Sequence, residues 1–209
     1  MTEPLVIIGA GGFGREVAMA AEACDPAWSV WGFFDDRVDE NVTIEGWERL
    51  GVLNDAKPDN PCVIAVGNPR LRRALCARLS ARGSRFVTID VEGLRHPSVS
   101  ISHGGMLVAG VRTTVNTSIG KHFIANLNCT IGHDVVIGDF VTIAPLVAIS
   151  GNVRIGDGVE IGTAACIREG VTIGKGAMIG MGAVVVKDVA PNSVVVGNPA
   201  RHVKELEPW

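Results

Sequence analysis

The pair His133-Asp134 is the strongest candidate for chemistry in this chain. Of the five His residues, His133 alone is followed directly by a carboxylate, and Asn126 lies seven residues before it. A neutral imidazole near pH 7 is the most available base for removing a proton from an attacking amine or hydroxyl. We therefore predict that His133 is a general base whose tautomer the carboxylate of Asp134 fixes; the alternative is an exposed surface His. Because no Cys or Ser stands beside it as an activated nucleophile, direct attack is favoured over a covalent intermediate.

A glycine-rich turn, Gly9 to Gly14, separates the apolar run Leu5 to Ile8 from the Ala-rich stretch Arg15 to Cys24. A turn between a strand and a helix suits close approach of a phosphate to backbone N–H groups. The acidic pair Asp35-Asp36 follows about twenty residues later, where it could hold a ribose or a base edge. Because residues 1–90 supply only half of a doubly wound sheet, a mononucleotide-sized ligand is favoured; the alternative is a tight turn without a ligand. The predicted ligand-binding residues are Gly9, Gly11, Gly12, Phe13, Asp35 and Asp36.

A second turn of the same kind, Gly67-Asn68, follows the apolar run Cys62 to Val66 and precedes a basic helix expected from Leu71 to Arg82. Because the carboxyl ends of parallel strands meet at one edge of a sheet, both turns should line one crevice. We predict that Gly67, Asn68 and Arg72 also bind the ligand. For the arginines of this helix, the alternative is a solvated face.

A six-residue period governs the chain from Ile101 to Ala190. Such a period is typical of a parallel β-helix, in which three short strands form each 18-residue coil. Residues 18 apart should then stack about 4.8 Å apart. The first position of each repeat is Ile, Leu or Val in thirteen of fifteen blocks, which predicts that it faces a common core. These positions are Ile101, Leu107, Thr113, Ile119, Ala125, Ile131, Ile137, Ile143, Ile149, Ile155, Ile161, Ile167, Ile173, Ile179 and Val185.

Residues before about 90 alternate strand and helix patterns and lack this period, so a parallel α/β sheet is expected there. Further strands are predicted at Trp31 to Phe34 and at Arg85 to Ile89, with a link from Asp90 to Ser100. We predict an N-terminal domain at 1–94 and a β-helix domain with a C-terminal tail at 95–209.

Composition excludes several classes of protein. The net charge of -3 argues against nucleic acid as a partner, and no apolar run reaches the length of a membrane span. The first residues lack the basic region of a secretory signal. The five Cys are scattered without metal-binding spacing, so we expect reduced thiols in the cytoplasm and no metal requirement.

The whole chain resembles the bacterial sugar acyltransferases grouped with sialic-acid O-acetyltransferase and the nucleotide-amino-sugar N-acetyltransferases. The resemblance implies a Rossmann-like domain followed by a left-handed β-helix, in a homotrimer that binds acetyl-CoA between adjacent β-helices. The stretches that carry it are Gly9 to Gly14, Phe34-Asp35-Asp36, Ala65-Val66-Gly67-Asn68 with Arg72, Asn126 to His133-Asp134, and Gly197-Asn198-Pro199-Ala200-Arg201.

The resemblance also implies roles for single residues. His133 matches the catalytic base, Asp134 its acidic neighbour, and Asn126 a polar residue beside the acceptor. Gly151 matches a position that touches the pantetheine arm of CoA. The residues matching the end near the CoA nucleotide are Gly197, Pro199 and Arg201. The expected reaction is acetyl transfer from acetyl-CoA to the amine of a nucleotide-linked amino sugar.

Three alternatives stay open. Many N-acetyltransferases of the group carry His where this chain has Phe13, so an O-acetyltransferase of sialic acid or another surface-polysaccharide sugar is the nearest rival. A γ-class carbonic anhydrase needs several His ligands on one zinc, and His103, His122 and His133 do not lie whole coils apart. The third alternative is a non-catalytic β-helix that binds nucleotide sugars.

Overall fold

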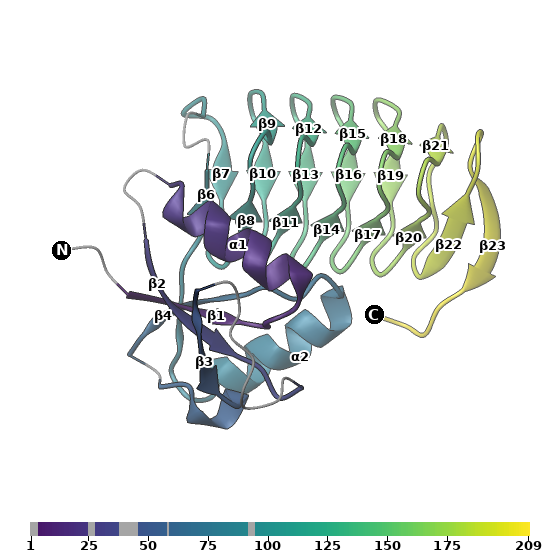
Figure 1. Ribbon diagram of the computed structural model, residues 1–209. Helices are drawn as coiled ribbons and strands as arrows, with labels where there is room; N and C mark the ends of the chain where they lie inside the picture. Colours follow the sequence, from purple (N-terminus) through teal and green to yellow (C-terminus); the bar gives the residue numbers. More distant parts are fainter. Residues whose placement is uncertain (1–3, 25–27, 38–45, 58, 92–94) are drawn as a thin grey trace.

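The protein consists of an α/β domain that lies against the side of a parallel β-helix (Figure 1). The computed structural model describes residues 4–24, 28–37, 46–57, 59–91 and 95–209. The fold class predicted from the sequence is confirmed, because a parallel sheet precedes three stacked columns of two-residue strands.

The N-terminal sheet has, within the described residues, five parallel strands in the order β3-β2-β1-β4-β5. Alternate side chains of β1 face opposite ways, as in any strand. Leu5 and Ile7 pack with helix α1 in one core cluster, while Val6 and Ile8 pack with Leu79 of helix α2 in another. The elements are β1 (Pro4–Ile8), α1 (Gly12–Glu22), β2 (Ser29–Phe34), β3 (Glu48–Gly51), a 3-10 helix (Leu53–Asp55), β4 (Pro61–Ile64), α2 (Pro69–Ser80) and β5 (Arg85–Phe86).

The β-helix stacks its coils in the register that the six-residue period predicts. Ile155 pairs with Ile137 below and with Ile173 above, each 18 residues away, and all three are at most 3% exposed. One column contains β7 (Ser100–Ile101), β10 (Ser118–Ile119), β13 (Val136–Ile137), β16 (Arg154–Ile155) and β19 (Thr172–Ile173). The second contains β6 (Ile89–Asp90), β8 (Met106–Leu107), β11 (Ile124–Ala125), β14 (Thr142–Ile143), β17 (Glu160–Ile161), β20 (Met178–Ile179), β22 (Ser193–Val196) and β23 (Arg201–Glu205). The third contains β9 (Arg112–Thr113), β12 (Thr130–Ile131), β15 (Ala148–Ile149), β18 (Cys166–Ile167) and β21 (Val184–Val185).

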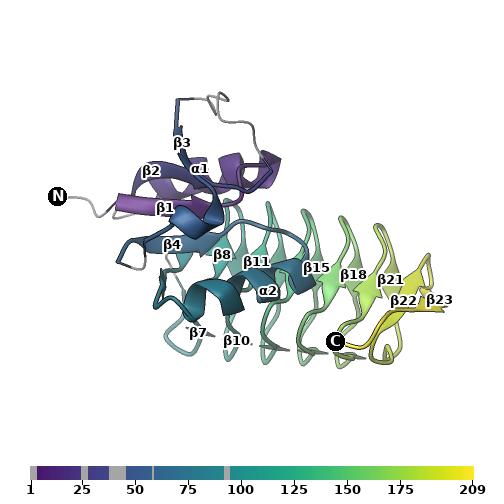
Figure 2. The same cartoon turned by 90° about the horizontal axis from the view of Figure 1, so that it is seen from below.

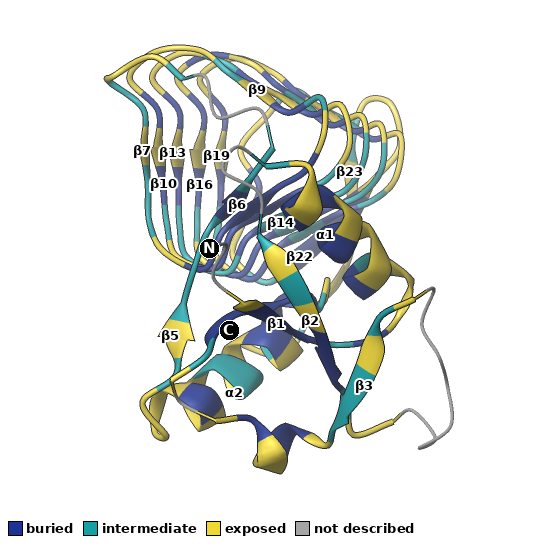
Figure 3. Cartoon of the chain, turned by 60° about the vertical axis from the view of Figure 1, so that its left-hand side comes forward, coloured by how far each residue is buried: buried dark blue, intermediate teal, exposed yellow. Residues whose placement is uncertain are grey.

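The two parts share a hydrophobic core. Val17 of α1 and Ile7 of β1 belong to the same buried cluster as Met106 and Ile124 on the outer face of the second column. Figure 3 shows this buried layer in dark blue where α1 meets the coils. The relative placement of the two parts is therefore set by apolar packing as well as by polar contacts.

The end of the chain returns to the N-terminal domain. After β23 the backbone runs back towards the first turn of α2, and α2 itself lies along the flank of the coils (Figure 2). Arg70 donates a hydrogen bond to the carbonyl of Pro208 over 2.9 Å, and the guanidinium of Arg73 lies 4.3 Å from the ring centroid of Trp209. These contacts tie α2 to the tail that follows the upper coils.

The structure corrects one predicted element. The residues from Arg85 to Ile89 do not form a single strand, because β5 closes the N-terminal sheet whereas β6 pairs with β8 in the β-helix. Strand β3 and the 3-10 helix were not predicted. The proposed domain boundary at residue 94 lies outside the described residues.

Candidate active site

His133 lies in an exposed corner of the β-helix, two residues after the end of β12, and its side chain is 51% exposed. Its Nδ1 lies 2.8 Å from Oδ2 of Asp134, so the predicted pair is formed. Asn116, one coil below, donates from Nδ2 to Oδ1 of Asp134 over 3.1 Å. These two hydrogen bonds, that from His133 first, hold the pKa of Asp134 below its usual value, so the residue is a carboxylate at neutral pH.

The carboxylate of Asp134 orients the imidazole. When Nδ1 of His133 carries the proton and donates it to Asp134, Nε2, on the edge of the ring that lies beside Gly151, keeps a free lone pair and can accept a proton. Asn116 was missed in the sequence analysis, although it stands 18 residues before Asp134. The coil period could have found it, because residues at that spacing stack.

Gly151 lies one coil above His133 and against its imidazole ring. A β-carbon built at position 151 would lie 2.5 Å from Cε1 of His133, closer than atoms can approach. Residues 133 and 151 therefore stack at the 18-residue spacing expected from the sequence. Because Gly151 has no side chain, the imidazole of His133 can occupy the space beside it.

Asn126 lies at a different corner of its coil from His133. It follows β11 in the second column, whereas His133 follows β12 in the third. Its Oδ1 accepts the backbone N–H of Leu127 over 2.8 Å. Within one chain, Asn126 and His133 share no hydrogen bond, so the role of Asn126 beside the acceptor stays a prediction.

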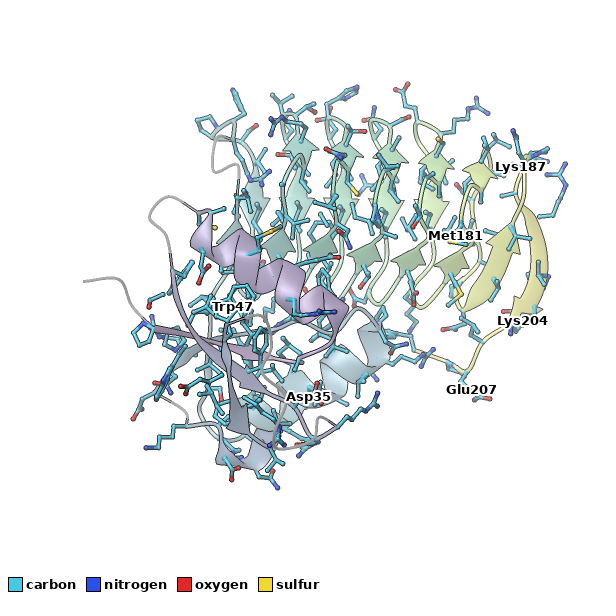
Figure 4. The ribbon with its side chains drawn as sticks, viewed as in Figure 1. Asp35, Trp47, Met181, Lys187, Lys204 and Glu207 are labelled. Carbon is cyan, nitrogen blue, oxygen red and sulfur yellow. The ribbon has the colours of Figure 1, made fainter. Side chains whose placement is uncertain are left out.

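A cleft of about 420 Å³ opens at the carboxyl end of the N-terminal sheet. It joins the glycine turn to the acidic pair, as predicted, since Gly9, Gly11, Asp35 and Asp36 all line it. Figure 4 shows Asp35 at this end of the domain, far from Met181 and Lys187 on the upper coils. Several other lining residues were not predicted from the sequence, namely Arg37, Leu53, Leu71, Leu75 and Arg78.

The glycines of the first turn differ in what they do. Gly9 has a φ of 105°, and a β-carbon on Gly14 would overlap the carbonyl oxygen of Gly9, so both are required by backbone shape and helix packing. Gly11 has open space around its α-carbon, and the nearest atom to a β-carbon on Gly12 would be Arg15 at 3.9 Å. These two positions leave the backbone at the start of α1 open to a ligand.

The start of α1 has the electrostatics of an anion site. Gly11 caps the helix without a side-chain hydrogen bond, and the first turn carries no acidic residue. Free N–H groups and the helix dipole there favour a phosphate. Arg37 and Arg78 add cationic side chains to the cleft. Phe13 is half-buried and packs against the core cluster around α1.

Asp35 and Asp36 also organise the cleft itself. Oδ2 of Asp35 accepts the backbone N–H of Ala10 over 2.8 Å, which fixes the glycine turn against β2. Oδ1 of Asp36 accepts the N–H of Leu53 over 2.7 Å, while its Oδ2 lies 3.8 Å from Nη1 of Arg78. Asp36 is about half-exposed and is thus the carboxylate with more room for a ligand.

The polar groups of the second glycine turn, Gly67-Asn68, are used in hydrogen bonds within the protein. Oδ1 of Asn68 accepts the backbone N–H of Leu71 over 2.9 Å and so caps α2, with Pro69 in the first turn. The carbonyl of Gly67 accepts a hydrogen bond from Oγ1 of Thr142 over 2.7 Å. Gly67 and Asn68 are exposed beside the cleft but do not line it.

The prediction that Arg72 binds the ligand is wrong. Its side chain is fully buried between the two parts of the protein, and its N–H groups donate to backbone carbonyls and to Thr142. Basic residues at a helix start resemble an anion site in sequence, and only the packing of α2 on the coils shows that this one points inward.

Of the residues predicted to contact CoA, Gly197, Pro199 and Arg201 lie at the far end of the β-helix, whereas Gly151 lies beside His133. Gly197 has a φ of 93° and follows β22, and the peptide bond between Asn198 and Pro199 is cis. Arg201 is exposed at the start of β23 and lines a cleft of about 610 Å³ with Lys187 and His202. The CoA roles of Gly151, Gly197, Pro199 and Arg201 stay predictions.

The described part of the chain contains no group of three or more His, Cys, Asp or Glu side chains that could hold a metal ion. None of its helices has the length and apolar character needed to cross a bilayer.

Comparison with known proteins places both parts of the chain. Residues 4–79 match the family model of the PglD N-terminal domain, and residues 152–187 match that of the bacterial transferase hexapeptide (six repeats). GDP-perosamine N-acetyltransferase of Escherichia coli is 33% identical over 148 residues, 64% of this chain and 64% of that enzyme. The match thus spans less than two thirds of the length of this curated relative.

Solved structures match over nearly the whole chain. Perosamine N-acetyltransferase from Caulobacter crescentus, as a point mutant in complex with CoA and GDP-perosamine, has a TM-score of 0.88 at 27% identity, over 98% of this chain and 99% of that chain. The acetyltransferase domain of PglB from Neisseria gonorrhoeae, in complex with acetyl coenzyme A, has a TM-score of 0.88 at 33% identity, over 97% of this chain and 100% of that chain. With these matches, the chain belongs to the bacterial sugar acyltransferases that join a PglD N-terminal domain to hexapeptide repeats.

Proposed function

We propose that this protein transfers an acetyl group from acetyl-CoA to the amine of a nucleotide-linked amino sugar. The observation that carries the proposal is an exposed His133 whose Nδ1 is held by Asp134, in a chain that also has a nucleotide-sized cleft. The relatives named for perosamine N-acetylation, one of them solved with CoA and GDP-perosamine, support the same reaction class.

The reaction is a direct transfer in a ternary complex. The amine attacks the thioester carbonyl while Nε2 of His133 takes a proton from the nitrogen, so the C–N bond forms as the C–S bond breaks. Asp134 stabilises the resulting imidazolium through Nδ1. The imidazolium can then return its proton to the departing CoA thiolate, which leaves His133 neutral for the next turnover.

The nucleotide occupies the cleft of the N-terminal domain. Its phosphates lie on the backbone N–H groups of Gly11 and Gly12 at the start of α1, next to Arg37 and Arg78. The half-exposed carboxylate of Asp36 accepts hydrogen bonds from the base or ribose. The open space around Gly11 and Gly12 supports this assignment over a turn without a ligand.

Acetyl-CoA lies along the β-helix, past Gly151 and towards Gly197, Pro199 and Arg201, in a groove between subunits of a homotrimer. Exposed apolar side chains support an interface at the corner after the second column. Leu127, Leu146 and Met181 are 38%, 56% and 78% exposed there. Sedimentation of the native protein should give three times the mass of the chain.

The test is a panel of UDP-, GDP-, dTDP- and CMP-linked amino sugars, each incubated with acetyl-CoA. Mass spectrometry of the product and titration of released CoA should show one N-acetylated sugar formed at a rate equal to CoA release. Acetylation of a hydroxyl on sialic acid or a polysaccharide sugar, with no reaction of any amine, would favour the O-acetyltransferase alternative. Binding of a nucleotide sugar without CoA release from any pair would favour a non-catalytic protein.

A further inference from the structure

The side chain of Arg72 has no exposed surface. Among the described residues, it is the one buried side chain of the Asp, Glu, Lys and Arg types. Arg is rarely buried completely unless its charge and all its N–H groups are satisfied. Arg72 sits on the inner face of α2 and extends into the joint between the N-terminal domain and the coils. Its burial is therefore explained by the groups to which it donates hydrogen bonds.

The guanidinium joins acceptors from both parts of the chain. On the N-terminal side, Nη1 donates to the carbonyls of Val66 and Gly67 over 2.6 and 2.9 Å. On the β-helix side, Nε donates to the carbonyl of His122 over 3.0 Å, and Nη2 donates to that of Phe140 over 2.7 Å. Nη2 also donates to Oγ1 of Thr142 over 2.8 Å and to the carbonyl of Val141 over 3.3 Å. All five N–H groups of Arg72 thus have acceptors.

Thr142 completes the connection from the β-helix side. Its hydroxyl accepts from Arg72 and donates to the carbonyl of Gly67 over 2.7 Å, so that carbonyl is held by both parts at once. Glu160 stacks on Thr142 one coil above, where burial raises the pKa of its carboxyl group and the nearby Arg72 opposes that shift. Burial lowers the pKa of Arg72 to about 9, and Glu160 opposes the shift, so Arg72 is a cation at neutral pH.

The loop Val66-Gly67, whose carbonyls Arg72 holds, leads directly to the cleft. Val66 lines the cleft, and α2, which begins after Gly67, supplies Leu71, Leu75 and Arg78 to it. Every residue that lines this cleft belongs to the N-terminal domain, whereas His133 belongs to the β-helix. A ligand bound by the N-terminal domain and a base on the β-helix meet in the correct geometry only if the two domains keep a fixed relative position.

We propose that Arg72 is a positioning residue that sets the nucleotide cleft against the β-helix, so that the sugar amine meets the catalytic base. The inference rests on the proposed function. It differs from the ligand role expected from the sequence, because a positioning residue acts on the rate of the bound complex and leaves affinity for the nucleotide unchanged. A misplacement of about 1 Å can cost roughly 10²-fold in rate.

The test compares Arg72→Met, Arg72→Lys and Thr142→Val in the full-length protein. Arg72→Met should lower kcat by about 10- to 100-fold, while the Kd values for CoA and for the parent nucleoside diphosphate stay within about twofold. Thr142→Val should show the same pattern with a smaller loss. Because the two residues share one hydrogen bond, the double variant should lose less than the product of the two single losses. If Arg72→Met does not fold, Arg72→Lys and Thr142→Val carry the test.

A matched control is Arg82→Met. Arg82 also donates to backbone carbonyls, those of Leu53, Asn54 and Ala56, but all of them lie in the N-terminal domain. This variant should keep kcat within about twofold of the parent, because no contact between the two parts is lost.

Amide hydrogen exchange provides a readout that does not need activity. In Arg72→Met, peptides covering residues 66–72 and 139–143 should exchange faster than in the parent, with little change at residues 160–180. Unchanged exchange at 66–72 and 139–143 overturns the proposal, and so does an unchanged kcat. A raised Kd for the nucleoside diphosphate with kcat intact would also overturn it, in favour of a ligand role. If the parent transfers no acetyl group to any amino sugar, the proposed function fails, and the exchange result still decides whether Arg72 holds the two parts together.

Discussion

The imidazole of His133 lies over the α-carbon of Gly151, one coil further along the β-helix. A β-carbon on Gly151 would come within 2.5 Å of Cε1 of the ring. The base and the glycine are therefore linked, since the orientation that Asp134 gives to the imidazole is available only while position 151 has no side chain.

Gly151→Ala should consequently displace the imidazole while leaving the coil folded. The clash falls on an exposed side chain that can rotate away at little cost. We expect kcat to fall by about 10- to 100-fold, because the base leaves its aligned position. Steady-state kinetics and a thermal melt check this, and Ser150→Ala on the same coil is the control. A parental kcat in Gly151→Ala would show that the ring does not need this position.

Protonation of His122 should weaken the protein in mild acid. His122 is 1% exposed, stacks on Phe140 at 5.1 Å between ring centroids, and lies 3.1 Å from Sγ of Cys76. Burial first, then the nearby His103 and Arg72, lower its pKa to about 4, although Asp139 opposes the shift and Lys121 adds to it.

The unfolded chain takes up this proton near pH 6.5, whereas the folded protein does not until about pH 4. The free energy of unfolding should therefore drop by roughly 3 kcal/mol as the pH falls through this window. Urea unfolding at several pH values measures the drop. The variant His122→Phe should lack it, and Phe140 shows that a Phe fits this corner with a φ of 57°. Equal pH slopes in parent and variant would contradict the assignment.

Ile155→Asp should destroy the fold. Ile155 is stacked between Ile137 and Ile173 inside the coil and is 3% exposed. An unpaired carboxylate there costs at least several kcal/mol, comparable with the whole stability of a domain. Arg154→Asp, on the exposed side of the same strand, should stay folded. Expression in the soluble fraction and circular dichroism distinguish the two; a stable Ile155→Asp protein would mean that the register is wrong.

The two binding sites should respond separately to substitution. Asp36→Ala removes a carboxylate from the N-terminal cleft, so KM for the nucleotide sugar should rise about tenfold while KM for acetyl-CoA stays unchanged. Arg201→Ala, at the far end of the β-helix, should give the reverse pattern. Initial rates with each substrate varied in turn measure both constants. Equal effects of either variant on both constants would contradict the division of the sites.

The β-helix could be predicted in register because thirteen of the fifteen repeats place an Ile, Leu or Val at their first position, and stacking in 18-residue coils buries these side chains together. The pairing of Ile155 with Ile137 and Ile173 followed from spacing alone. The break between β5 and β6 could not be predicted, because two short apolar runs that belong to different sheets read as one strand.

The parts of the site that could be predicted are those in which the residues in contact are neighbours in the chain or end adjacent strands. His133 and Asp134 are neighbours in the chain, and the glycine turn and the acidic pair end adjacent strands. The sequence failed at Arg72, because the side of α2 that meets the coils depends on how the two parts pack. Arg78 was missed for the same reason, although it follows Leu71 and Leu75 at helical spacing and lines the cleft with them.

The measurement that tests the account most directly is the turnover of His133→Ala with acetyl-CoA and the best amino-sugar acceptor. The account predicts a folded protein with parental Kd for CoA and a kcat lowered by roughly 10²- to 10⁴-fold, the usual share of a general base. Asp134→Asn should lose less, because it removes only the orientation and charge held at Nδ1. A His133→Ala protein that turns over within about threefold of the parent would contradict the central claim, because the imidazole would then take no part in the transfer.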